Sequence, residues 1–151
     1  MTRLRPIRTE GLDRRWAILF ATWVVAVAAT LGALFIGEFL GKAPCYLCWH
    51  QRVFMFPLAV ILGIASWRSD DGIAPYALPL ALIGWLIAAV HLLLFWDVIP
   101  RAIEPCGAGP SCSGSSMTIF GFLPLPLLSL LAFTLIATGL FIVMRGRITH
   151  E

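Results

Sequence analysis

Two cysteines separated by two residues, Cys45 and Cys48, are the residues of this chain best suited to chemistry. They begin an apolar stretch, and Arg52 follows Cys48 at a spacing of one helical turn. Pro44 suits the first position of a helix, so we expect both cysteines in its first turn, where free N–H groups and the helix dipole stabilise a thiolate. A cation at i+4 on the same face can lower a thiol pKa or hold a polar headgroup. The pattern predicts redox chemistry at a membrane surface.

A second pair, Cys106 and Cys112, lies in a segment over 100–118 that is rich in glycine and proline. Such a composition favours turns, and a loop this long in a small protein is usually functional or disordered. The chain from Pro100 to Cys106 can extend by up to about 20 Å. This reach covers both an aqueous partner and the first cysteine pair.

The composition predicts an integral membrane protein formed by one domain over residues 1–151. Hydrophobic residues make up 60% of the chain and charged residues 13%, about half the share that is usual in a soluble domain. Four apolar runs are long enough to cross a hydrocarbon layer of about 30 Å as helices. We therefore expect an all-α fold, a four-helix transmembrane bundle. The predicted spans are Trp16–Leu40, Trp49–Trp67, Pro75–Ile99 and Ile119–Met144.

Basic residues gather at the two chain ends and in the short connection over 68–72. The positive-inside rule therefore places both termini in the cytoplasm and the segments 41–48 and 100–118 on the outer, oxidising side. We expect the location to be a bacterial inner membrane. A cleaved signal peptide is the alternative for the first run, but the run continues to Leu40, well beyond an ordinary signal core.

Other roles for the cysteines fit their spacing less well. Zinc is disfavoured because five residues separate Cys106 from Cys112, more than zinc motifs usually have, so no metal site is expected. Covalent haem attachment requires histidine directly after the second cysteine, where Trp49 stands. Purely structural disulfides remain an alternative, although the short first loop would add little stability.

Three stretches of this chain resemble the DsbB family of disulfide bond formation proteins, in particular its shorter BdbC-type members. The first and most specific runs from Pro44 to Arg52, the second is the loop with Cys106 and Cys112, and the third runs from Phe120 to Leu128. With four spans in the same order, the resemblance covers nearly the whole chain.

The resemblance implies a membrane oxidoreductase that re-oxidises a thioredoxin-fold protein of the DsbA or BdbD kind and passes two electrons to a quinone, ubiquinone or menaquinone. By position, the partner's thiolate would attack Cys106, and Cys112 would then react with Cys45. Cys48 would face the quinone, with Arg52 beside the headgroup. The enzyme would sustain disulfide formation in exported proteins.

Several other polar residues are candidates. His91 matches the family's histidine in the third span and could hydrogen-bond quinone or assist proton uptake, or could simply be packed and bonded to a helix carbonyl. Phe95 stands where the family often has a glutamine. Gln51 could orient Arg52 or the headgroup. Glu38 and Asp97 lie near outer helix ends, where such groups usually reach water but could also transfer protons.

Two rival functions differ in testable ways. A vitamin K epoxide reductase-like protein would carry its membrane cysteine pair after the loop pair, whereas here it comes first. A non-enzymatic four-helix membrane protein, with structural disulfides or a zinc site in its outer loops, predicts cysteines that do not exchange.

Overall fold

The structure, a computed structural model, describes residues 7–98, 118–119 and 123–148. Four long helices dominate these residues, and two residue pairs before the last helix form a minimal antiparallel β-ladder. The elements are α1 (Ile7–Leu34), the π-helical segment η1 (Phe35–Phe39), α2 (Tyr46–Arg68), the 3₁₀ turn η2 (Asp71–Ile73), α3 (Ala74–Phe95), β1 (Thr118–Ile119), β2 (Leu123–Pro124) and α4 (Leu125–Ile148).

The expected four-helix membrane fold is confirmed. Within the described ranges, four helical segments are long and apolar enough to cross a membrane: Asp13–Phe39, Tyr46–Arg68, Asp71–Phe95 and Leu125–Arg147. Their outer faces expose large apolar side chains such as Leu31, Val60, Leu86 and Leu135, which suits contact with lipid.

Three predicted boundaries were wrong. Pro44 does not begin the second helix, because Cys45 is its N-cap and Tyr46 its first residue. The third helix ends at Phe95 instead of Ile99, and the chain turns through Asp97 in a left-handed conformation (φ 55°). The fourth helix begins at Leu125 instead of 119, since the β-ladder uses the preceding residues. Apolar runs predict membrane crossings, but caps and turns decide where each helix starts and ends.

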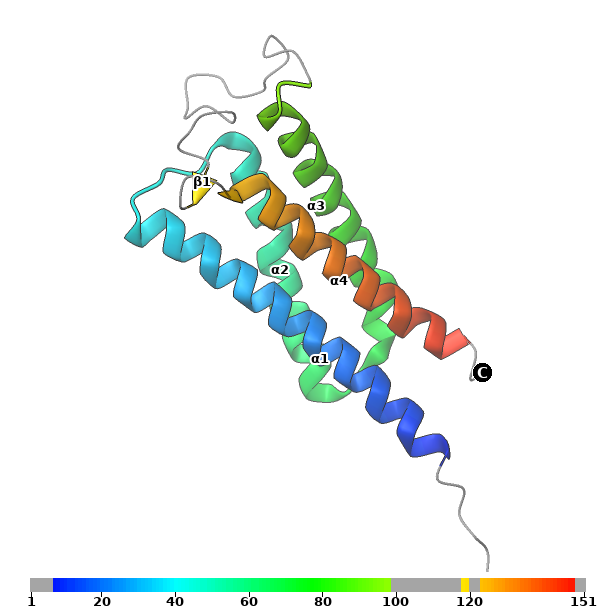
Figure 1. Cartoon of the computed structure of the whole chain (residues 1–151). Helices are drawn as coiled ribbons and strands as arrows, with labels where there is room; N and C mark the ends of the chain where they lie inside the picture. Colours follow the sequence, from blue (N-terminus) through cyan, green and yellow to red (C-terminus); the bar gives the residue numbers. More distant parts are fainter. Residues whose placement is uncertain (1–6, 99–117, 120–122, 149–151) are drawn as a thin grey trace, which may run out of the picture.

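The helices form a closed ring in which α1 packs on α2 and α4, and α3 packs on the same two helices. In Figure 1 the start of α1, the α2–α3 connection and the end of α4 lie together at one end of the bundle. The start of α2 and the β-ladder lie at the other end. A salt bridge of 3.0 Å between Arg15 and Asp71 joins α1 to the α2–α3 connection.

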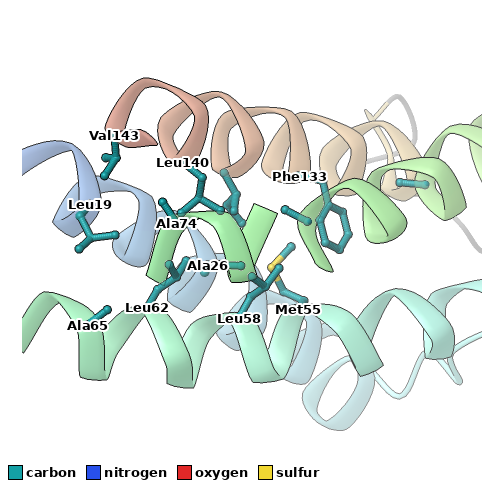
Figure 2. Close-up of a cluster of buried hydrophobic side chains, with 14 residues drawn as sticks. Leu19, Ala26, Met55, Leu58, Leu62, Ala65, Ala74, Phe133, Leu140 and Val143 are labelled. Atoms are coloured by element: carbon teal, nitrogen blue, oxygen red, sulfur yellow. The ribbon is translucent and has the colours of Figure 1, made fainter. Parts of the chain in front are cut away.

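The core combines large and small side chains. One buried cluster, drawn in Figure 2, includes Leu58 and Leu62 of α2 and Phe133 and Leu140 of α4, all fully buried. The buried face of α3 contributes mainly alanine, at Ala74, Ala77, Ala81 and Ala88. Small residues allow membrane helices to approach closely, which strengthens their van der Waals contacts.

Gly84 is expected to be essential for the contact between α3 and α4. A Cβ atom at this position would lie 2.8 Å from Cδ1 of the fully buried Phe133 ring and closer still to other ring atoms. Gly84→Ala should therefore destabilise the protein by about 1–3 kcal/mol, the usual cost of overpacking. Thermal unfolding in detergent measures the effect, with Gly32→Ala as control because its Cβ would meet no atom within 4 Å. Equal stability of the two variants would contradict the prediction.

Candidate functional site

Cys45 and Cys48 lie at the start of α2 with their sulfur atoms 3.0 Å apart. Cys45, as N-cap, accepts a hydrogen bond from the backbone N–H of Cys48 at 3.3 Å. The Cys45 side chain is fully buried, whereas Cys48 is half-buried and lines a cavity. Both are free thiols in this structure. The helix start thus holds the two sulfur atoms together with only one of them facing the cavity.

His91 on α3 completes the surroundings of Cys45. Its Nε2 lies 3.7 Å from the Cys45 sulfur, and its Nδ1 lies 3.1 Å from Nε2 of Gln51. His91 is fully buried and Gln51 nearly so, and both reach the cavity wall. Gln51 and His91, both predicted from the sequence as site residues, therefore contact each other. Gln51 supplies the polar partner of His91 from α2, whereas Phe95 packs against the apolar cluster that contains Cys45.

The surroundings favour the thiolate form of Cys45. The hydrogen bond with the Cys48 thiol is the main cause, and the contacts with His91 and the Cys48 N–H act in the same direction. Burial opposes them, but the net result lowers the pKa of the Cys45 thiol to about 4. Cys45 is thus the thiolate of the reduced pair at neutral pH.

This ionisation predicts how the reduction potential of the Cys45–Cys48 pair depends on pH. Between pH 5 and 7, above the low pKa of Cys45, reduction should take up one proton for two electrons. The potential should then fall by about 30 mV per pH unit, half the slope of about 59 mV expected if both thiols gained protons. Equilibration of Cys106→Ser/Cys112→Ser protein with thiol buffers measures it. A slope near 59 mV would show that Cys45 gains a proton in this range.

Arg52 is held by the end of α1. Its Nη2 donates a hydrogen bond of 2.6 Å to the carbonyl oxygen of Ala33. Ala33 lies two residues before the π-helical segment, where the change from i+4 to i+5 bonding disturbs the pairing of helix carbonyls. Gly37 makes room for the guanidinium, because a Cβ there would lie 3.0 Å from Nη2. The irregular end of α1 therefore fixes a cation beside the cysteines.

A cavity of about 720 Å³ adjoins these polar groups. Its volume is within the range of about 300–1,000 Å³ typical of small-molecule sites. Its walls are mainly apolar and come from α1 and α4, while Cys48, Gln51, Arg52 and His91 supply polar groups at one side. This arrangement suits a largely apolar ligand with a polar, redox-active headgroup. The main wall residues are Ala29, Gly32 and Ala33 of α1 and Leu128, Ser129 and Ala132 of α4.

The remaining predicted residues lie elsewhere. Cys106 and Cys112 fall outside the described residues. Glu38 and Asp97 are exposed near the cysteine end of the bundle and do not line the cavity. The sequence reasoning missed Lys42, which lines the cavity and donates a hydrogen bond of 2.7 Å to the Thr118 carbonyl. Its position three residues before Cys45 was the available signal.

Three potential metal ligands also lie close together at this site. The ligand atoms of Cys45, Cys48 and His91 lie within 4.8 Å of one another, so a thiophilic ion could contact all three. Within the described part of the chain, however, no fourth histidine, cysteine or acidic residue joins the cluster. A structural zinc site uses four protein ligands, and the open side here faces the cavity instead.

Comparisons with known proteins identify the family of this chain. The family described as "Disulfide bond formation protein DsbB" matches residues 14–143. A "Probable disulfide formation protein" of Metapseudomonas resinovorans is 58% identical over 131 residues, covering 86% of this chain and 91% of the relative. The "Disulfide bond formation protein C" of Bacillus subtilis (strain 168) is 43% identical over 127 residues, covering 83% of this chain and 91% of the relative. No solved structure matches. Four membrane helices, a cysteine pair at the start of α2 and these relatives lead to one conclusion: the chain belongs to the DsbB family, membrane oxidoreductases of disulfide bond formation.

Proposed function

We propose that this protein re-oxidises a thioredoxin-fold dithiol protein of the DsbA or BdbD kind and passes the electrons to a membrane quinone. The observation that carries the proposal is the position of Cys48 in the wall of an apolar cavity beside Arg52. A cysteine that served only as a staple would not need a cavity or a fixed cation.

The proposed exchange conserves atoms and electrons. The partner's thiolate attacks the Cys106–Cys112 disulfide and forms a mixed disulfide with this protein. The partner's second thiol then displaces Cys106, so the partner leaves with its own disulfide formed, and Cys106 and Cys112 are both reduced. The Cys112 thiolate next attacks Cys45 in the Cys45–Cys48 disulfide, and the electron pair of that bond goes to Cys48. When the Cys106–Cys112 bond re-forms, the two electrons remain with Cys45 and Cys48.

The final step uses the cavity. The Cys45 thiolate and the Cys48 thiol form their disulfide again, and their two electrons, the Cys48 proton and one proton from water convert quinone to quinol. Arg52 supports the polar headgroup, and the apolar walls of α1 and α4 accommodate the rest of the molecule. The direction is favourable because partners of the DsbA kind are strong oxidants, with potentials of roughly −120 mV, and their re-oxidation requires a still stronger oxidant.

The orientation is part of the proposal. The end of the bundle with Arg15 and Arg147 faces the cytoplasm of a bacterial inner membrane, and the cysteine end faces outward. Two observations support this orientation: basic residues from both chain ends gather at the Arg15 end of the bundle, and the cysteine chemistry at the other end needs an oxidising compartment. Labelling of single cysteines introduced at each end, with a membrane-impermeant maleimide on intact cells, tests this orientation.

Quinone reduction by the purified protein tests the function. The assay supplies a reduced thioredoxin-fold partner and either ubiquinone or menaquinone. Turnover should require the partner and should be lost in Cys106→Ser, although dithiothreitol should still reduce the Cys45–Cys48 pair in that variant. The absence of turnover with several partners and both quinones, in folded protein, would favour a non-enzymatic protein with structural disulfides.

A further inference from the structure

The contact between Gln51 and His91 determines which ring nitrogen of His91 carries the proton. The amide nitrogen of Gln51 lies 3.1 Å from Nδ1 of His91, and an amide nitrogen can only donate a hydrogen bond. Nδ1 must then accept, so in the neutral ring the proton is on Nε2. Nε2 is the atom that lies 3.7 Å from the Cys45 sulfur.

We propose that Gln51 is a positioning residue that fixes His91 as the Nε2–H tautomer and thereby directs an N–H donor toward the sulfur of Cys45. The opposite tautomer would present a lone pair to that sulfur, and a lone pair repels a thiolate. The amide of Gln51 therefore decides whether His91 stabilises or destabilises negative charge on Cys45.

The catalytic meaning of this role rests on the proposed function. In that cycle the bond between Cys45 and Cys112 breaks, and the electron pair remains on the Cys45 sulfur. The same thiolate then forms the bond to Cys48 as two electrons leave for quinone. An N–H directed at the sulfur stabilises the Cys45 thiolate whenever it forms in the cycle, because charge-assisted hydrogen bonds are strong in a buried site.

Burial makes the arrangement effective. Cys45 and His91 are fully buried, and Gln51 is 7% exposed, so water competes little for their hydrogen bonds. Among the described residues, the titratable groups that act on Cys45 are Cys48 and His91, and the charged side chains of Arg52 and Lys42 also line the cavity. The cavity walls contributed by α1 and α4 contain no titratable side chain among the described residues.

The first test is the tautomer itself. ¹⁵N NMR of histidine-labelled protein distinguishes Nε2–H from Nδ1–H, and the spectrum of His91→Phe identifies the His91 signals among those of the three histidines. Wild-type protein should show His91 as the Nε2–H form. If the wild-type spectrum shows the proton of His91 on Nδ1, this result alone would overturn the proposal.

The second test measures the thiolate. In Cys48→Ser/Cys106→Ser/Cys112→Ser protein, Cys45 is the one remaining thiol of the four cysteines, and ¹³Cβ-labelled cysteine reports its titration despite its burial. Gln51→Met, or Gln51→Leu if the first variant does not fold, should raise the titration midpoint of Cys45 by about one pH unit, a tenfold loss in the ratio of thiolate to thiol. His50→Gln is the matched control, because His50 contacts the Tyr46 carbonyl of its own helix instead.

A double-mutant cycle separates positioning from a direct effect. If Gln51 acts through His91, Gln51→Met should add no shift in the His91→Phe background. An unchanged midpoint in Gln51→Met, or an equal shift in both backgrounds, would overturn the proposal. These measurements use neither quinone nor partner, so their failure is distinct from a failure of the proposed enzymatic function.

Discussion

Replacement of Cys48 by serine is expected to abolish quinone reduction while leaving the bundle folded. A hydroxyl cannot exchange with a disulfide, so electrons that reach Cys45 would have no route to the cavity. Loss of a residue that forms the covalent bond commonly reduces turnover by about 10⁴-fold or more. The measurement is the rate of quinone absorbance loss with reduced partner, at quinone concentrations well above the wild-type KM.

Ser129→Ala is the matched control for this variant. Ser129 also lines the cavity, but its hydroxyl bonds to the Pro126 carbonyl of its own helix. We expect nearly normal turnover, since the substitution removes an oxygen without removing an electron carrier. Substantial turnover in Cys48→Ser would show that electrons leave by another sulfur, and the assignment of Cys48 would be wrong.

Replacement of Arg52 by alanine is expected to weaken quinone use strongly. A hydrogen bond to a charged group contributes about 1.5–3 kcal/mol, which corresponds to roughly a 10- to 100-fold rise in the KM for quinone. Arg52→Lys should recover only part of this loss, because an ammonium lacks the planar fork that can hold the Ala33 carbonyl and a headgroup at once. Steady-state kinetics over a quinone series measures both variants. Wild-type KM in Arg52→Ala would remove Arg52 from the quinone site.

Gly37→Ala tests whether the position of the Arg52 guanidinium matters, because it leaves the arginine itself unchanged. The added methyl would lie 3.0 Å from Nη2 of Arg52 and 3.4 Å from Nη1, so the guanidinium must move while keeping its charge. We expect a smaller rise in KM than for Arg52→Ala. Gly32→Ala, whose methyl would meet no protein atom within 4 Å, controls for an added methyl on the same membrane span. A larger effect of Gly32→Ala than of Gly37→Ala would argue that cavity volume matters more than the position of Arg52.

The chain determines its fold class because apolar length and charge asymmetry are properties of local sequence. Four runs of sufficient length require four helices, since a backbone in lipid must satisfy its own hydrogen bonds. The sequence also predicted that Cys45, Cys48 and Arg52 would lie close together, because they fall within about two turns of one helix. The family relationship followed from these residues and was confirmed by the comparisons.

Only the tertiary structure decided how residues far apart in sequence meet. The separations of 40 residues between Gln51 and His91 and of 19 between Ala33 and Arg52 carry no periodic signal. Helix rotation, the π-helical end of α1 and the cap at Cys45 bring these groups together, and each depends on packing between helices. The sequence therefore predicted which residues would carry the proposed chemistry, whereas packing determined that Cys45 is buried against His91 and that Cys48 faces the cavity.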